Sequence, residues 1–473
     1  MSSDKKWTML LTLLAALWVF GPADGQTASG RFVLISDIHF NPFHDPSLFP
    51  QLVEQPVEQW EKLFASSHKA LWSRYGEDSN YALLKSTLDD ARSRLAAPDF
   101  ILYPGDYLAH QWQAKYDALA KKSHDSDPVA YRRFTTKTMQ FLAREFRIRW
   151  PNSPIIGTLG NNDSFCGNYS ITPQGPFLAM FADVWRGLLG GGMHFAEPAK
   201  DFSDHSLYTV RIAHMKRHRI VVLNDAYWSN RYDNACGRIT QTPALDQLAA
   251  LENILADCRS AGEKVWLLLH IPAGIDNYAS SAKAQGQHGR PVTFWQQTLT
   301  SRFAQLAERY APTVQIIFAG HTHMDDFRII RLNGEESLLM KIAPSISPIF
   351  GTNPCYQTYQ YDGSTGRIEN YQSVFLPLND THGRTGADGR ARWELEYDFG
   401  KIYRWPELNA ATVEKLAGQI RTGAITRHRY GEFYDSGGPT RFDAATINAY
   451  RCAILNTTPA HYRKCVEAPN PAP

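Results

Sequence analysis

The sequence has little net charge and few cysteines, and each shortage excludes a class of function. Its 49 Lys and Arg residues nearly balance 47 Asp and Glu residues, which leaves a formal charge of +2. So small an excess gives no electrostatic basis for binding a nucleic acid polymer. None of the six cysteines has the spacing of a zinc finger, and the sequence shows no internal repeat or low-complexity tract.

Long apolar runs are also scarce, and the one clear example lies at the N-terminus. Met9 to Phe20 is apolar, follows Lys5 and Lys6, and precedes the small residues Ala23 to Gly25. This order is typical of a signal peptide, and the run is too short to span a bilayer comfortably. We therefore expect residues 1–25 to be removed. The mature protein should be a monomer without a transmembrane anchor, in a secreted, periplasmic or lysosome-like compartment.

Export would allow disulfide bonds. Cys452 and Cys465 lie close together in a short terminal segment and are the first expected pair. Cys166 and Cys236 lie in polar loops and are the second. Cys258 falls on the apolar stripe of a predicted helix, so we expect a buried free thiol there.

Strands alternate with helices in the first part of the chain, and hairpins dominate later. This mixture predicts a layered α/β fold with mixed sheets over residues 26–380. After about residue 380 the pattern changes to a polar, glycine-rich stretch followed by two capped helices. Residues 381–473 are therefore predicted to form a small helical C-terminal segment.

Five predicted strands end in a turn that carries metal-ligand residues. The strands are Phe32–Ile35, Phe100–Tyr103, Pro154–Gly160, Val265–Leu269 and Val314–Ala319. The turns after them contain Asp37, His39, Asp106, Asn161, His270, His321 and His323. One such residue at a strand end is usually a cap or a satisfied polar group. Five such turns, with carboxylate, amide and imidazole ligands, favour a metal site at the strand ends.

Seven ligands suit two metal ions if one carboxylate is shared. We assign Asp37, His39, Asp106 and His323 to the first ion. Asp106, Asn161, His270 and His321 are assigned to the second. His321 and His323 are two residues apart, so an extended segment would place them on one side, able to reach different ions. Mixed imidazole and oxygen ligation suits zinc, manganese or iron, and we expect zinc in an exported protein.

These motifs resemble those of the calcineurin-like metallophosphoesterase superfamily. Within it, the chain resembles the acid sphingomyelinase-like phosphodiesterases, through the stretches Gly105–His110, His270–Gly274, Gly320–Asp325 and Ala343–Pro354. The resemblance implies a four-layer fold with two mixed sheets between helices. It also implies hydrolysis of phosphodiesters by a metal-bridging hydroxide, without a covalent intermediate. The spacing of Cys452 and Cys465 is similar to that of the family's terminal disulfide.

One position departs from the family pattern. The family has histidine after the metal-binding asparagine, and this chain has Asn162 there. Asparagine can hydrogen-bond a phosphate oxygen but cannot supply a proton. The family's other histidine, four residues after the bridging aspartate, is kept as His110. We therefore expect His110 to be the general acid and Asn162 to orient the phosphate.

The expected substrate is a small-molecule or lipid-headgroup phosphodiester. Few residues separate Gly25 from the first predicted strand, which leaves no room for the saposin-like domain of acid sphingomyelinase. The expected lack of this domain favours soluble phosphodiesters or phosphoanhydrides as substrates. The alternatives are a nucleotide phosphohydrolase or endopolyphosphatase with the same metal core, and a non-catalytic phosphate-binding protein. The retention of all seven ligands argues against the last.

Overall fold

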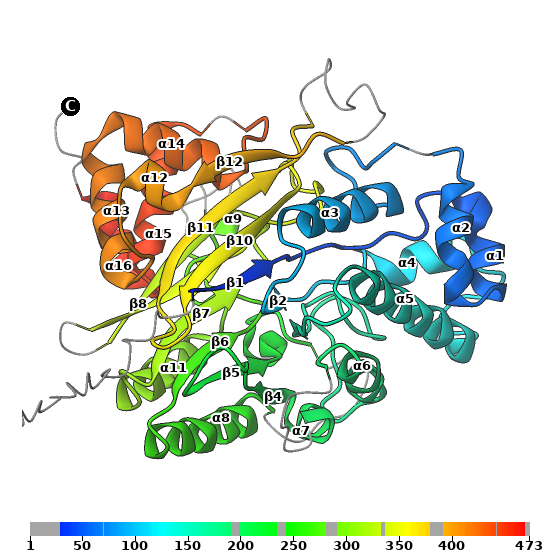
Figure 1. Cartoon of the computed structure of the whole chain (residues 1–473), viewed down its shortest axis with the longest axis horizontal. Coiled ribbons are helices and arrows are strands. Elements are labelled where there is room, and N and C mark those ends of the chain that lie inside the picture. The colour runs from blue at the N-terminus through cyan, green and yellow to red at the C-terminus, as the bar shows by residue number, and fades with distance from the viewer. Residues whose placement is uncertain are drawn as a thin grey trace, which may run out of the picture.

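The computed structural model describes residues 29–69, 71–190, 198–233, 243–280, 291–332, 336–378, 391–440 and 442–468. These residues form two six-stranded mixed sheets with helices on their outer sides (Figure 1). The predicted α/β sandwich is therefore confirmed. The predicted signal peptide and Cys236 lie outside the described residues, so export and the pairing of Cys166 with Cys236 stay predictions. Among the residues described, no helix is long and apolar enough to cross a bilayer.

The first sheet joins strands from both ends of the chain. Its order is β12 (Glu394–Asp398), β11 (Ile368–Phe375), β10 (Cys355–Asp362), β1 (Ser29–Leu34), β2 (Phe100–Tyr103) and β3 (Ile155–Gly157). The strands β1, β2 and β3 are parallel, and the other pairs are antiparallel. The three parallel strands therefore end at the same edge of the sheet.

The second sheet comes from the middle of the chain. Its order is β4 (Leu207–Val210), β5 (His218–Leu223), β6 (Lys264–Leu268), β7 (Val314–Ala319), β9 (Ser337–Ile342) and β8 (Asp326–Arg331). The predicted hairpin of β4 and β5 is present, and β5, β6, β7 and β9 run parallel.

Aromatic side chains fill the space between the sheets. The ring of Phe32 on β1 lies 5.6 Å from the rings of both Trp266 on β6 and Phe318 on β7. The four residues of β2 are all buried. A strand covered on both faces needs a continuous apolar run, and this explains why the early strands are easy to find in the sequence.

Helices cover the outer faces and begin where the sequence offers caps. Asn80 accepts a hydrogen bond from the Leu83 amide at the start of α3 (Tyr81–Arg94), over 3.0 Å. Asp127 caps α5 (Pro128–Arg149) in the same way through the Ala130 amide, over 3.1 Å. The other helices before residue 378 are α1 (Phe49–Glu54), α2 (Trp60–Ala65), α4 (Trp112–Asp117), α6 (Pro176–Arg186), α7 (Pro198–His205), α8 (Pro243–Ser260), α9 (Asn277–Ser280) and α11 (Gln297–Arg309). Three short 3-10 helices span Pro46–Leu48, Val57–Gln59 and Asp225–Trp228.

The C-terminal segment is helical, as predicted, but it also completes the first sheet through β12. Its helices are α12 (Phe399–Tyr403), α13 (Ala410–Thr422), α14 (Ala424–Tyr434), α15 (Ala444–Leu455) and α16 (Pro459–Glu467). The helices α13 and α15 pack against β8. The boundary at residue 380 stays a prediction.

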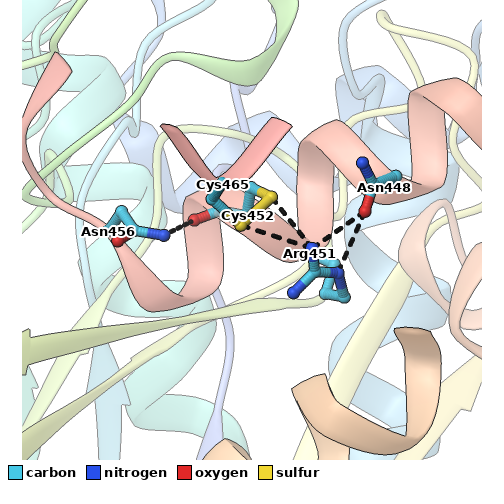
Figure 2. The surroundings of a disulfide bond; sticks show 5 residues. All are labelled: Asn448, Arg451, Cys452, Asn456 and Cys465. Atoms are coloured by element: carbon cyan, nitrogen blue, oxygen red, sulfur yellow. Dashed lines mark hydrogen bonds between the residues drawn. A yellow bond between two sulfur atoms is a disulfide. The ribbon is translucent and has the colours of Figure 1, made fainter. Parts of the chain in front are cut away.

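The predicted disulfide Cys452–Cys465 is present and ties α15 to α16, with 5.7 Å between the Cα atoms (Figure 2). The Arg451 guanidinium lies beside both sulfurs, at 3.0 Å and 3.3 Å, and is held by Asn448 (Figure 2). Cys258 is a buried free thiol, as expected, and so is Cys355.

Candidate metal centre

The loops that follow β1, β2, β3, β6 and β7 meet where the two sheets face each other. After β6, the Nδ1 of His270 donates to the carbonyl oxygen of Pro104 over 2.9 Å. After β7, the His321 amide donates to the carboxylate of Asp37 over 3.1 Å. The structure thereby brings together all seven side chains predicted as ligands, from both sheets.

These side chains form two clusters that share Asp106. In the first, ligand atoms of Asp37, His39 and Asp106 lie within 4.8 Å of one another. His323 joins it, with its Nε2 3.1 Å from the Nε2 of His39 and 3.6 Å from Oδ1 of Asp37.

The second cluster contains Asp106, His270 and His321, again within 4.8 Å. Asn161 joins it through Oδ1, 3.0 Å from the Nε2 of His270. Both clusters match the division predicted from the sequence.

Hydrogen bonds behind the clusters turn lone pairs toward their centres. His39 and His270 donate from Nδ1 to the carbonyls of Leu108 and Pro104, both over 2.9 Å. Each therefore directs its Nε2 toward the centre of a cluster, 3.3 Å from Oδ2 of Asp106. The amide nitrogen of Asn161 donates to Asn168 over 2.7 Å, which points its oxygen inward. Imidazole nitrogens that converge with carboxylate and amide oxygens in this way are a donor set that fits a pair of metal ions.

The electrostatics of the buried groups point the same way. Burial lowers the pKa of His39 and His270, but the Asp106 carboxylate outweighs burial and raises them to about 9 and about 10. Burial works in the opposite direction on Asp106, yet the facing imidazoles hold its pKa well below the usual value. Burial, reinforced by the neighbouring histidines, keeps the pKa of His321 and His323 well below 6.5. The cavity therefore favours positive charge beside Asp106 and neutral imidazoles around it.

Five of the predicted ligands lie in the left-handed region of backbone conformation. The φ angles are 50° for Asp37, 45° for His39, 60° for Asp106, 74° for His321 and 64° for His323. Such conformations cost side-chain-bearing residues of order 1–3 kcal/mol each and persist only where surrounding contacts hold them. The expectation that His321 and His323 lie on an extended segment is therefore wrong. They reach different clusters because the backbone turns at each of them.

Two buried carboxylates hold the turns in place. Asp163 accepts hydrogen bonds from four amides, those of Asp106, Tyr107, Leu108 and Gly160, over 2.8–3.1 Å. It therefore ties the loop after β2 to the loop after β3.

Asp225, at the end of β5, accepts from the amides of His270 and Ile271 over 2.9 Å and 3.1 Å. It also accepts from the Trp295 indole over 3.0 Å. Each carboxylate thus fixes a ligand-bearing loop of a neighbouring strand.

The loops after β2 and β3 also touch directly, through glycines. A Cβ atom on Gly160 would lie 2.1 Å from Oδ1 of Asp106, and one on Gly105 would lie 2.4 Å from the Gly160 nitrogen. Glycine at both positions is thus a packing requirement for placing the shared carboxylate.

His110 and Asn162, the predicted proton donor and phosphate-orienting residue, both border the clusters. The His110 ring stacks on the His39 ring at 3.9 Å and an angle of 26°. Asn162 donates from its backbone amide to Oδ1 of Asp106 over 2.9 Å and from its side chain to Oδ2 over 3.0 Å.

Aromatic and cationic groups surround the clusters. Phe350 is 55% exposed and contacts the rings of His323 and His110 edge-on, at 4.6 Å and 5.4 Å. On the other side, the Tyr169 hydroxyl lies 3.2 Å from the Nε2 of His321. Arg231 lies over the Tyr169 ring, 5.7 Å from its centroid, and its side chain is 56% exposed.

A family model described as calcineurin-like phosphoesterase matches residues 30–325, which include every residue of the two clusters. The chain belongs to the calcineurin-like phosphoesterase family. The resemblance found in the sequence is therefore confirmed, as is the metallophosphoesterase fold.

Relatives of this phosphoesterase extend over almost the whole chain. It is 24% identical to human acid sphingomyelinase-like phosphodiesterase 3b, over 98% of this chain and 95% of the relative. It is 23% identical to rat cyclic GMP-AMP phosphodiesterase SMPDL3A, over 94% of both chains. It is 25% identical to sphingomyelinase phosphodiesterase D of Dictyostelium discoideum, over 79% of this chain and 80% of the relative. The predicted similarity to the acid sphingomyelinase-like branch is confirmed.

Sequence reasoning missed three buried carboxylates that support this phosphoesterase centre. Asp225 follows β5 just as the predicted ligands follow their strands, so the same pattern would have found it. Asp163 is part of the motif after β3, but only the structure shows its four donors. Asp78, which contacts His110, lies in a loop without any periodic pattern.

Proposed function

We propose that this phosphoesterase is an exported phosphodiesterase that works with two divalent metal ions, zinc by expectation. The observation that carries the proposal is the convergence of carboxylate, amide and imidazole groups on two points that share Asp106. Asp37, His39, Asp106 and His323 would hold one ion, and Asp106, Asn161, His270 and His321 the other. When bound, such a pair polarises a phosphate and lowers the pKa of a water nucleophile.

The chain's own residues would then orient the phosphate and protonate the leaving group. Asn162 lies beside Asp106 and offers an amide N–H to a phosphate oxygen. An amide N–H is too weak an acid to transfer its proton, so the leaving oxygen needs another donor. His110 also lies within 4.8 Å of His39 and His323, but each of the two proposed ions has four ligands without it. We therefore assign proton donation to His110, as the sequence predicted.

The substrate is proposed to be a sphingomyelin-type or soluble phosphodiester. Arg231 supports the soluble alternative, in which the substrate is a nucleotide or polyphosphate. Its side chain is 56% exposed, and its guanidinium pairs with Asp276 at 3.8 Å and lies beside Tyr169, which contacts His321. A second phosphate next to the scissile one would interact favourably with that charge, whereas the cationic end of a choline headgroup would not.

Parallel assays separate these substrates. Sphingomyelin, bis-p-nitrophenyl phosphate, ATP and polyphosphate should be compared at matched metal content, with the wild type and Arg231→Gln. Phosphodiester cleavage that requires added Zn²⁺, Mn²⁺ or Fe²⁺ after chelation supports the proposal. Hydrolysis of none of the four substrates by the metal-loaded protein would refute it. A selective loss on ATP and polyphosphate in Arg231→Gln would favour the soluble anionic class.

A further inference from the structure

A buried carboxylate holds both the backbone and the ring of His110. Oδ1 of Asp78 accepts from the Nδ1 of His110 over 2.8 Å, and Oδ2 accepts from the His110 amide over 3.1 Å. The Asp78 side chain has no exposed surface. A carboxylate can only accept such a bond, so the pairing requires a proton on Nδ1 and leaves Nε2 to face elsewhere.

Asp78 itself is held on several sides. Lys115 on α4 donates to Oδ2 of the same carboxylate. The Asp78 carbonyl accepts from the Ser73 hydroxyl over 2.7 Å, and the next carbonyl, of Ser79, accepts from the Asn41 amide over 2.7 Å. Burial tends to raise the pKa of Asp78, but the His110 hydrogen bond and nearby cations keep it below the usual value. The carboxylate is thus both fixed in place and ionised.

The other contacts of the His110 ring restrict its plane. One face stacks on His39 at 3.9 Å, and the edge-on ring of Phe350 lies 5.4 Å away. With Asp78 on Nδ1, the ring can neither flip nor tilt without losing a contact. The His110 side chain is still 21% exposed, so it is not sealed off from solvent.

We propose that Asp78 is the positioning residue of the proton donor and that Lys115 holds Asp78 in turn. The inference rests on the proposed role of His110. In the proposed step, the oxygen of a water that has lost a proton forms a bond to phosphorus, while the P–O bond to the leaving group breaks and its electron pair goes to the leaving oxygen. That oxygen takes the Nε2 proton of the His110 imidazolium. The Nδ1 proton stays on the ring, hydrogen-bonded to Asp78, so the imidazole product has a single tautomer.

The test compares two diesters that differ in their need for a proton. Diphenyl phosphate releases phenolate, a poor leaving group, and bis-p-nitrophenyl phosphate releases the much better p-nitrophenolate. His110→Ala should lower kcat on diphenyl phosphate by about 100-fold or more and much less on the nitrophenyl ester. Asp78→Asn should show the same selectivity, with a loss of about 10- to 100-fold, and Lys115→Met a smaller one of the same kind.

A double-mutant cycle shows whether Asp78 acts through His110. In the His110→Ala background, Asp78→Asn should cause almost no further loss on diphenyl phosphate. The matched control is Asp398→Asn, which removes a buried carboxylate that caps α12 and bonds Asn370 and Gln372, remote from the site. It should leave kcat on both esters unchanged. Asp78→Glu replaces Asp78→Asn if the latter does not fold, because it keeps the charge but moves the acceptor.

The kinetic results distinguish a failure of the role of Asp78 from a failure of the role of His110. If His110→Ala discriminates between the esters but Asp78→Asn lowers both equally, or adds fully to His110→Ala, Asp78 is a structural residue and the inference is wrong. If His110→Ala itself does not discriminate between them, the proposed function of His110 fails and the inference fails with it. Equal kcat values for Asp78→Asn and the wild type on both esters would also overturn the inference.

Discussion

Asp163→Asn is the substitution that tests most directly how the fold holds the shared ligand. The wild-type carboxylate accepts four amide hydrogen bonds, two at each oxygen. In the variant, one oxygen becomes an NH₂ group that faces two N–H donors and can accept from neither. Two buried amide donors are left without an acceptor, each at a cost of about 1–3 kcal/mol, so the free energy of unfolding should fall by about 2–6 kcal/mol.

The lost hydrogen bonds lie at the metal centre, so both the stability of the protein and its metal content should change. Two of the donors are the amides of Asp106 and Gly160, so the loops after β2 and β3 are no longer tied together. Asp106 needs that tie because its φ angle is 60°. We expect a lower urea midpoint and a metal content well below that of the wild type, measured by elemental analysis after dialysis.

The comparison variant is Asp398→Asn, where the carboxylate accepts from one backbone amide, that of Lys401, and from two side chains. It should lose only about 1 kcal/mol, the value of an ordinary hydrogen bond, and keep its metal. If Asp163→Asn also lowers the free energy of unfolding by less than about 1 kcal/mol and retains full metal content, the Asp163 carboxylate does not hold the site.

Three further substitutions have distinct expected outcomes. Asp106→Asn should remove metal from both clusters and lower phosphodiester hydrolysis by at least about 100-fold, since the shared ligand is lost; full activity at normal metal content would contradict a dinuclear centre. Gly160→Ala should reduce metal affinity while the protein stays folded, because its methyl group would meet the Asp106 carboxylate; calorimetric titration with Zn²⁺ measures this. Burial, then the carboxylates of Asp325, Asp435 and Glu432, raise the pKa of Glu396 well above 4.5. The folded state therefore retains a proton that the unfolded state loses, and stability falls as pH rises from about 4.5 toward the folded-state pKa. Glu396→Gln should abolish this fall, and unfolding in urea at pH 4.5 and 7.5 checks it.

The convergence of the candidate ligands could be predicted because parallel strands end at the same edge of a sheet. A strand buried on both faces reads as an apolar run, and its carboxyl end lies at the edge where its parallel neighbours also end. Residues that follow such runs meet in space even when they are far apart in sequence, as His270 and Asn161 do. The same rule would have found Asp225, which follows β5.

Buried polar pairs concealed the rest of the first sheet from sequence reasoning. Gln357 on β10 is fully buried, although glutamine is a polar residue that is usually exposed. It donates to Asp325 over 2.7 Å and to Ser373 on β11 over 2.9 Å. Asp325 in turn pairs with Lys341 on β9, also fully buried. A strand whose polar side chains are satisfied by partners from other strands shows no apolar run, so β10, β11 and β12 could not be found before the fold was known.

The backbone at the ligands could not be predicted either, and it changes how the motifs are understood. Two histidines separated by one residue can serve two ions from an extended segment, but His321 and His323 have φ angles of 74° and 64°. Asp37, His39 and Asp106 share this conformation, and β1 and β2 have already ended, at Leu34 and Tyr103, before these residues. L-residues adopt it only under tertiary constraint, supplied here by Asp163 between the loops after β2 and β3 and by Asp37 itself, which accepts the His321 amide. These hydrogen bonds therefore hold the ligand-bearing turns after β2, β3 and β7 in their bent conformation.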